Sequence, residues 1–475
     1  MPFYLFPYEN IPQNSRVIIY GAGNVGCCFI KQIINTRYCK IVAVADKKCE
    51  GKDFLGFKYI NPSDIKKEVF DFVVVAVNNI FVAEKICNNL IFDYKIAHAS
   101  IVLGCQRDYS DAKENVVEDY VCTRRSVPKI HIGVSMGPGL GDIIFYKRFI
   151  LELISKIKCD FCIDIYAVPG CYGFVKSIYS DLTNINIIDG DFLLLRKNKY
   201  NYDIAFVLCM LIKFEGRDSW GLIRKDTVFA KIIENLIVRI KENGLDMMKY
   251  TDQYIQYERA KRIGENCYTS FNYSGIFNIF DYHVNIPLQN EAFRLFDSLH
   301  LSNYITLTYG WCKKVVLKGN TIDKVWPLEY YEKLVKLLKE KYPAYKLVQV
   351  GAKDNTKIAG VDYYAIGLDL EVSKYILKYS TLHIDCEGGL VHLATQLGTK
   401  CVVMFGPTHI SYYGYKENIN IMASDCCCEC RHLVVGHECM RGLDKPECMY
   451  KISVGQVFEK TKIYLDGICN RDKHK

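Results

Sequence analysis

The chain has 475 residues, of which 50% are hydrophobic, and it carries a formal net charge of +8 at pH 7. This length predicts two or three domains with cores of their own. The 61 basic and 53 acidic residues are spread along the chain instead of forming blocks. That pattern argues against nucleic-acid binding and leaves a weak preference for anionic ligands or membrane surfaces.

We expect a cytoplasmic protein without a membrane-spanning segment, with peripheral membrane contact left open. The first residues, MPFYLFPYENIP, are apolar but short and interrupted by proline, unlike a secretory signal. The apolar runs at 72–77 and 204–210 are far too short to span a bilayer. Without export the 22 cysteines are expected to be reduced, so a cysteine cluster points to a metal site before a disulfide.

A first α/β unit is predicted over residues 1–112, with strands at 16–20, 40–45 and 70–77. Its turn GAGNVG and an acid about 20 residues further on follow the dinucleotide-binding pattern. In that pattern glycines admit a phosphate and the acid holds ribose hydroxyls. The alternative is a Rossmann-like unit whose pocket is empty or structural. The candidate residues for NAD(P) or another nucleotide are Gly21, Gly23, Gly26 and Asp46.

Two further α/β series follow a polar segment at 113–128, which we take as a linker. We expect one domain over 129–298 and another over 299–475. Apolar runs separated by helical patterns place strands at 130–134, 161–166, 204–209, 304–308, 345–351, 381–385 and 400–405. Helices are expected at 143–154, 328–341, 369–379, 390–397 and 453–467, and residues 222–265 are mostly helical.

Glycine-rich turns follow several of these strands and begin helices, most clearly at 387–389 and 405–408. A helix N-terminus presents unpaired N–H groups and the positive end of the helix dipole, and both suit a phosphate. Ligands of open α/β sheets bind at the carboxyl ends of the strands. A carboxylate beside the turn can hold sugar or ribose hydroxyls. The stretch therefore predicts a nucleotide-sugar site, the alternative being ordinary loops without a ligand.

Four motifs occur in order: GLGD at 139–142, KVWP at 324–327, EGGLVHLA at 387–394 and FGPT at 405–408. Together they resemble glycosyltransferase family nine, the ADP-heptose heptosyltransferases, over residues from about 129 to the end. The resemblance implies an α/β fold of the GT-B type. We therefore expect a pair of Rossmann-like domains preceded by a third, small Rossmann-like domain.

The resemblance also implies residue roles. Asp142 would be the base that deprotonates the acceptor hydroxyl, in an acceptor loop with Gly139 and Gly141. Its alternative role is a helix N-cap. The donor-binding residues would be Thr308, Gly310, Lys318, Lys324, Glu387, Gly388, Gly389, His392, Gly406, Pro407 and Thr408.

Lys324 matches a family lysine that contacts the donor phosphate, with a solvated lysine as the alternative. Trp326 and Pro327 are expected to be structural. The family pattern has Asp where this chain has Glu387, one methylene longer, which leaves the donor sugar open. His392 would bind phosphate or only cap and pack.

A cysteine cluster lies near the C-terminus. Cys427, Cys430, Cys439 and Cys448 have the spacing C-x2-C-x8-C-x8-C, which fits a closed, structural iron or zinc site. Cys426 and Cys428 could substitute as ligands, and His432 and His437 also lie within the segment. The alternatives are reduced thiols or a regulatory disulfide. In this feature the chain is similar to the iron-containing bacterial autotransporter heptosyltransferases.

The leading hypothesis is a glycosyltransferase that moves a heptose or related sugar from an ADP-activated donor to an acceptor hydroxyl. The acceptor would be lipopolysaccharide, another glycan, a lipid-linked precursor or a protein. One rival is an NAD(P)-dependent oxidoreductase acting through the first unit, although no hydride-transfer pattern such as Tyr-x-x-x-Lys is present there. Another is a non-catalytic sugar-nucleotide-binding protein. A homo-oligomer stays open. The first unit resembles the nucleotide-binding part of sugar acetyltransferases.

Overall fold

The chain forms two compact units in a computed structural model. One unit contains Met1–Asp111, Asn320–Asp323 and Ala423–Cys448, and the other contains Ala112–Gly319, Lys324–Met422 and Met449–Lys475. The structure describes residues 3–49, 51, 53–77, 80–107, 117–120, 129–242, 251–310, 324–431, 439–443 and 445–472.

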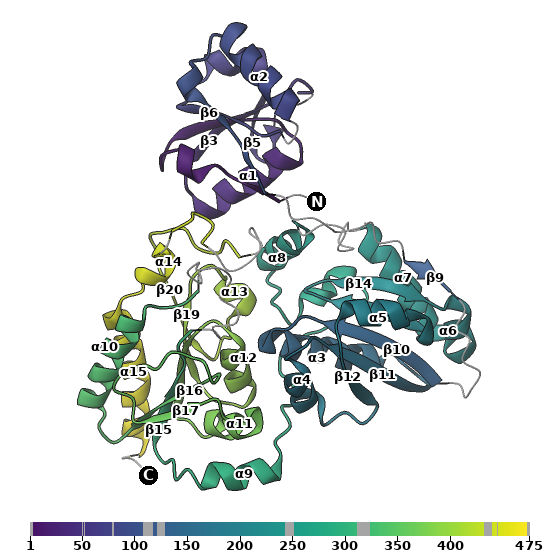
Figure 1. Ribbon diagram of the computed structural model, residues 1–475, viewed down its shortest axis with the longest axis vertical. Helices are drawn as coiled ribbons and strands as arrows, with labels where there is room; N and C mark the ends of the chain where they lie inside the picture. The colour runs from purple at the N-terminus through teal and green to yellow at the C-terminus, as the bar shows by residue number, and fades with distance from the viewer. Residues whose placement is uncertain are drawn as a thin grey trace. The chain divides into compact units, whose positions relative to one another are not determined.

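The N-terminal unit is built on a six-stranded sheet in the order β4-β5-β3-β2-β6-β7, parallel except for the β4–β5 pair. It is drawn in purple to blue in Figure 1. The short strands β1 and β8 pair antiparallel beside it. The strands are β1 (Phe3–Leu5), β2 (Arg16–Tyr20), β3 (Lys40–Ala45), β4 (Asp53–Phe54), β5 (Phe57–Ile60), β6 (Phe72–Val75), β7 (Ile101–Leu103) and β8 (Cys105–Arg107). The helices are α1 (Asn24–Thr36) and α2 (Ile80–Phe92).

The larger unit contains two more six-stranded sheets. The first has the order β12-β11-β10-β13-β14-β9, with β13 and β14 antiparallel. Its strands are β9 (Glu118–Asp119), β10 (Lys129–Met136), β11 (Asp160–Ala167), β12 (Ile185–Asp189), β13 (Ile204–Leu208) and β14 (Ile212–Arg217). Its helices are α3 (Leu140–Ser155), α4 (Tyr172–Tyr179), α5 (Phe192–Asn198), α6 (Ser219–Lys225), α7 (Thr227–Glu242) and α8 (Thr251–Ile263).

The third sheet is parallel throughout, in the order β17-β16-β15-β18-β19-β20. Numbered along the chain this order is 3-2-1-4-5-6, that of a doubly wound nucleotide-binding fold. Its strands are β15 (Tyr304–Leu307), β16 (Lys346–Gly351), β17 (Tyr363–Ile366), β18 (Leu382–Cys386), β19 (Cys401–Phe405) and β20 (Ile419–Met422). The helices are α9 (Asn290–Asp297), α10 (Leu328–Lys341), α11 (Leu370–Lys378), α12 (Gly389–Gln396), α13 (Ile410–Tyr413), α14 (Glu447–Tyr450) and α15 (Val454–Asp472).

These three sheets confirm the predicted α/β class with a pair of Rossmann-like domains and a third one ahead of them. The strands expected at 16–20 and 40–45 and the helix expected at 328–341 have the predicted bounds. Most of the expected linker lies outside the described residues, but its residues 118–119 form β9, which pairs with β14. The cysteine segment, expected within the C-terminal domain, is grouped with the N-terminal unit instead.

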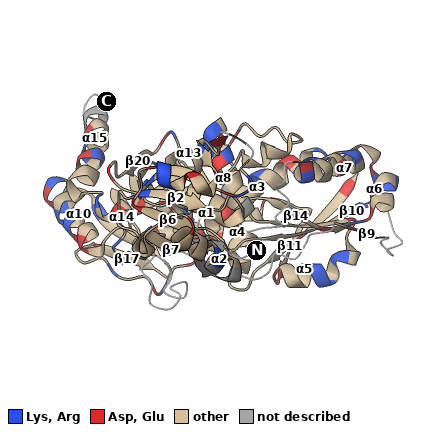
Figure 2. Ribbon diagram, turned by 90° about the horizontal axis from the view of Figure 1, so that it is seen from above, with Lys and Arg blue, Asp and Glu red and all other residues tan. Residues whose placement is uncertain are grey.

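The helical surfaces mix charges of both signs, as α7, α10 and α15 show in Figure 2. Each of these helices follows the amphipathic pattern, with buried apolar residues on one side and Lys, Arg, Asp and Glu on the other. Within the described part of the chain, none of the helices combines the length and apolar character needed to cross a bilayer.

Two fully buried lysines bind the segment that connects the two sheets of the larger unit. The Lys147 ammonium on α3 donates to the Ile178 carbonyl at 2.8 Å, the Asp181 carboxylate at 2.6 Å and the Asn285 carbonyl at 2.8 Å. Lys374 on α11 donates to Pro287 O at 2.8 Å and Glu371 Oε1 at 2.9 Å. Because both lysines are 0% exposed, these partners replace the water that each ammonium gives up.

Lys374→Ala is expected to destabilise the protein by about 3–5 kcal/mol, because it leaves the buried Glu371 carboxylate without its cation. The matched control is Lys378→Ala, which removes an exposed lysine from the same helix and should change stability by less than about 0.5 kcal/mol. Urea unfolding followed by circular dichroism measures both. Equal stabilities of the two variants would show that the buried lysine does not hold this segment.

Candidate functional site

The glycine turns of α3 and α12 meet within the larger unit. A Cβ on Gly141, in the first turn of α3, would lie 2.7 Å from His392 Cδ2 on α12. A Cβ on Gly389, the first residue of α12, would lie 2.8 Å from Leu140 Cβ and 3.3 Å from Gly141 N. Neither position has room for a side chain. The turns predicted to bind acceptor and donor are therefore brought together, with the positive ends of two helix dipoles side by side.

Lys324 and Glu387 form a buried ion pair at this place. Lys324 Nζ lies 3.0 Å from Glu387 Oε2, and the two side chains are 10% and 5% exposed. Burial alone would raise the pKa of Glu387, but Lys324 and His392 lower it well below its ordinary value. The carboxylate is therefore ionised at neutral pH. The alternative of a solvated Lys324 is not supported.

His392 contacts both the acid and a chain of buried hydroxyls. Its Nε2 lies 3.3 Å from Glu387 Oε1, and its Nδ1 lies 2.9 Å from the Tyr415 hydroxyl. The Tyr415 and Tyr268 hydroxyls are 2.6 Å apart, and Gln396 donates to the Tyr268 hydroxyl at 2.9 Å.

Gln396 links these hydrogen-bonded hydroxyls to the segment before the third sheet. It accepts a hydrogen bond from Val284 N at 2.8 Å and donates to Tyr282 O at 2.8 Å. Tyr268, Tyr415 and Gln396 lie in no recognisable motif. Tyr415 contacts His392, and the other two are linked to it through Tyr415, only in the folded chain, so no sequence pattern predicted them.

The KVWP motif positions Lys324 through its tryptophan. Trp326 is 0% exposed, its backbone N–H donates to Cys386 Sγ at 3.2 Å, and its indole N–H donates to the Ile452 carbonyl at 2.8 Å. Cys386 directly precedes Glu387. The motif is thus attached to the strand that carries the acid, which explains how residues 63 positions apart form the ion pair. The expectation of a structural Trp326 agrees with this packing.

Two buried hydroxyls lie at the carboxyl ends of β15 and β19. Thr308 and Thr408 are 4% and 1% exposed, and neither Oγ1 has a hydrogen-bond partner among the described residues. An unsatisfied buried hydroxyl is unfavourable, so both are candidates to bind a ligand. Gly310 has φ +72° with open space around it, and Gly406 and Pro407 are buried. A Cβ on Gly388 would lie 3.7 Å from Cys386 O, an ordinary contact.

Asp142 lies in the first turn of α3 and is half-buried. The N-cap is Gly139, so Asp142 is not the cap that we considered as an alternative. A Cβ on Gly139 would overlap the Asp142 carboxylate. Burial raises the pKa of Tyr146 and of Cys209, and the charge of Asp142 adds to both rises. Lys318 lies outside the described residues.

The predicted nucleotide residues of the N-terminal unit form a tight turn. Gly21 has φ +118°, and a Cβ there would lie 2.7 Å from Ala76 O. A Cβ on Gly26 would overlap the Gly21 carbonyl. Asp46 Oδ2 accepts from Ala22 N at 2.9 Å, and Asp46 Oδ1 accepts from Lys48 N at 2.9 Å. Gly23, the N-cap of α1, has an ordinary φ of −82° and no atom within 4 Å of a Cβ position.

The cysteine segment packs within the N-terminal unit. Arg441 lies over the Tyr38 ring at 5.1 Å, and Asn35 donates to Glu429 O at 2.5 Å. Among the described residues, no three His, Cys, Asp or Glu side chains are grouped to hold a metal ion. The site predicted from Cys427, Cys430, Cys439 and Cys448 therefore does not fit a metal as placed. His432 and His437 lie outside the described residues.

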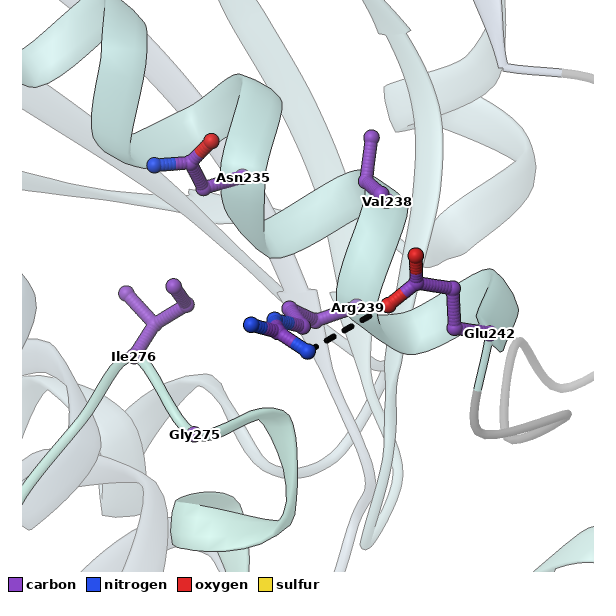
Figure 3. Close-up of a pocket in the computed structure, with 6 residues that line it drawn as sticks. All are labelled: Asn235, Val238, Arg239, Glu242, Gly275 and Ile276. Atoms are coloured by element: carbon purple, nitrogen blue, oxygen red, sulfur yellow. Dashed lines mark hydrogen bonds and ion pairs between the residues drawn. The ribbon is translucent and has the colours of Figure 1, made fainter.

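A pocket of about 320 Å³ lies elsewhere, beside α7. Figure 3 shows Arg239 and Glu242 turned toward each other in it, with Asn235 and Val238 on the same helix and Gly275 and Ile276 opposite. Arg239 and Glu242 are 3.4 Å apart and well exposed. The pocket contains none of the residues that the motifs identified.

The chain was compared with known proteins. A family model described as "C2185-like, N-terminal" matches residues 13–115. No curated protein sequence matches the chain. The structure of an E. coli ADP-heptose lipopolysaccharide heptosyltransferase II is 14% identical, with a TM-score of 0.45, over 71% of this chain and 98% of that one.

Two further similar structures are of TibC, a bacterial iron-containing dodecameric glycosyltransferase from enterotoxigenic E. coli. One has 12% identity and a TM-score of 0.47 over 78% of this chain and 82% of that one. The other, in complex with ADP-D-beta-D-heptose, has 14% identity and a TM-score of 0.46 over 74% and 78%. At these TM-scores the likeness carries no argument about this chain. Its chemistry has to be argued from its own residues.

Gly389→Ala should destabilise the protein by about 1–3 kcal/mol, because the added methyl group would push α12 away from α3. Gly388→Ala is the control: its φ is 177°, extended backbone that any residue adopts, and its Cβ would make only an ordinary contact, 3.7 Å from Cys386 O. Thermal unfolding of the two variants measures the difference. If both variants have the unfolding temperature of the unsubstituted protein, α3 and α12 do not approach each other as closely as described.

Proposed function

We propose that the protein is a glycosyltransferase that takes a sugar from a nucleotide-sugar donor, with an ADP-activated heptose or related sugar as the donor. The observation that carries the proposal is the meeting of the α3 and α12 turns, because it puts Asp142 in the same region as the Lys324–Glu387 pair. The four motifs in family order supply the residue types. The buried hydroxyls of Thr308 and Thr408 supply further ligands.

The proposed reaction is a single displacement. The acceptor hydroxyl oxygen forms a bond to the anomeric carbon as the bond from that carbon to the diphosphate oxygen breaks. Asp142 accepts the proton of the hydroxyl, since an alcohol is a weak nucleophile until it loses that proton. The bonding electrons leave with the diphosphate, whose charge Lys324 and the N-terminus of α12 stabilise. No step needs a metal ion bound by the cysteines.

Several finer assignments belong to the same proposal. The acceptor is a hydroxyl of lipopolysaccharide, another glycan, a lipid-linked precursor or a protein, reached in the cytoplasm. Cys427, Cys430, Cys439 and Cys448 would act away from the reaction, as a structural iron or zinc site if they move together from their described positions. Assembly into a homo-oligomer is a further proposal, and metal analysis and light scattering of the purified protein test both.

Asp142→Asn is expected to lower the rate of sugar transfer by at least about a hundredfold, the usual contribution of a general base. Binding of the donor should change little, because the substitution keeps the size of the side chain. Transfer assays with ADP-heptose and calorimetry of donor binding give the two readouts. Full activity of Asp142→Asn would remove Asp142 as the base. A purified protein that neither transfers nor hydrolyses any ADP-sugar would favour a non-catalytic binding role.

A second proposal concerns the N-terminal unit, which we infer to bind a nucleotide. Packing inside the protein explains glycine at 21 and 26, whereas nothing there requires it at 23, where a ligand phosphate could approach the backbone. The Tyr20 hydroxyl, on a residue 3% exposed, has no partner among the described residues. Burial, Tyr94 and Asp46 raise the pKa of Tyr20 to about 12, so it stays a hydrogen-bond donor at neutral pH.

Gly23→Ala is expected to lower stability by less than about 1 kcal/mol while weakening nucleotide binding by about tenfold or more, because the methyl group would occupy the ligand's space. Gly173→Ala, at an equally open position in α4, is the control. Calorimetry with NAD and ADP in a Lys324→Met background separates this site from the donor site. Equal nucleotide affinity in the two glycine variants would mean that Gly23 faces no ligand.

A further inference from the structure

Lys324, the cation proposed to hold the donor diphosphate, already has an anionic partner inside the protein. The ion pair with Glu387 is 3.0 Å long, and both side chains are at least nine-tenths buried. Water therefore solvates neither charge effectively, and each depends on the other. A diphosphate that binds Lys324 has to compete with this carboxylate for the ammonium group.

Glu387 would then keep one described contact, that of Oε1 with His392 Nε2 at 3.3 Å. His392 cannot move freely to follow it, because Tyr415 contacts its Nδ1 and the Phe145 ring packs edge-on at 4.6 Å. A buried carboxylate that loses its cation needs new hydrogen-bond donors. Sugar hydroxyls can donate to it, and hydrogen bonds to a charged acceptor are the strong kind.

A nucleoside diphosphate without the sugar offers no such compensation. Its terminal phosphate carries oxygens that accept hydrogen bonds and bring further negative charge toward Glu387. The charge of Lys324 would have to neutralise both the Glu387 carboxylate and this phosphate. The site thus opposes the bare nucleotide more strongly than the nucleotide sugar.

We propose that Glu387 makes the donor site selective for the complete nucleotide sugar over the nucleoside diphosphate that the reaction releases. When the donor binds, Lys324 passes to the diphosphate and the sugar hydroxyls donate to Glu387. After transfer the sugar has left with the acceptor, and Glu387 takes Lys324 back and helps to expel the product. This inference rests on the proposed glycosyltransferase function.

The glutamate suits this role better than the aspartate of the family pattern. Glu387 comes directly after β18, and the hydrogen bond from Trp326 N–H to Cys386 Sγ holds Lys324 near it. The additional methylene lets the carboxylate extend toward Lys324 Nζ. An aspartate at 387 would keep a carboxylate for the sugar but draw it back from the lysine.

The test is calorimetry of the full chain with two probes, ADP and ADP-D-beta-D-heptose. The unsubstituted protein should bind ADP-heptose at least about tenfold more tightly than ADP. Glu387→Gln should bind ADP about tenfold more tightly than the unsubstituted protein does, because the competing charge is gone. A residue that only binds the donor, or only supports the fold, would give unchanged or weaker ADP binding.

Three further variants test whether the change in ADP affinity comes from the Lys324–Glu387 pair. In a Lys324→Met background, Glu387→Gln should improve ADP binding clearly less than it does with Lys324 present, because only the repulsion between carboxylate and phosphate is left to remove. Glu340→Gln removes one negative charge from the exposed face of α10 and should leave ADP affinity unchanged. Glu387→Asp keeps the charge but draws the carboxylate back from Lys324, so it should bind ADP more tightly while still binding ADP-heptose. Its ADP affinity tests the selectivity inference if Glu387→Gln does not fold.

The outcomes distinguish the selectivity inference from the proposed function. If the unsubstituted protein binds ADP-heptose but Glu387→Gln and Glu387→Asp bind ADP no more tightly, the selectivity inference is overturned and the proposed function stands. If the unsubstituted protein binds neither ADP nor ADP-heptose, both fall together. An equally large gain in ADP binding in the Lys324→Met background would also overturn it, because the lysine would not be the contested group.

Discussion

The close approach of α3 and α12 is the constraint on which the candidate site depends. Gly141 and Gly389 leave no room for a side chain between the two first turns, so the helices touch through backbone and through His392. Two positive helix ends placed together repel each other unless negative charge lies near them. Asp142 and Glu387 supply such charge in the protein itself. A donor diphosphate would add to it, which makes this region favourable for an anionic ligand.

Buried charges in the larger unit serve two different purposes. Lys147 and Lys374 each have several protein partners around the connecting segment, so no ligand can replace them without unfolding that contact. Lys324 instead forms an ion pair with Glu387, an acid that has a second contact with His392. A pair of this kind can exchange partners when a ligand brings its own anion and its own hydrogen-bond donors.

The glycines of the N-terminal unit also serve different purposes. Gly21 and Gly26 are required by the turn and by the packing of α1 on β2, whereas Gly23 has open space around it. The cysteine segment belongs to this unit through contacts such as that of Arg441 with Tyr38. The chain therefore returns from the third sheet to the first unit before it completes α14 and α15.

The sequence by itself determined the local elements and the residue types of the site. Apolar runs and helical patterns placed most of the inner strands of all three sheets and several of the helices within a few residues, because burial selects those patterns. They did not predict outer strands such as β12, β17 and β20. The motifs identified Asp142, Lys324, Glu387 and His392. The tertiary structure alone decided that Lys324 and Glu387 form a pair, that Tyr415 links His392 to Tyr268, and that residues 423–448 join the N-terminal unit. These contacts join residues far apart in the chain, and no local pattern records the packing that brings them together.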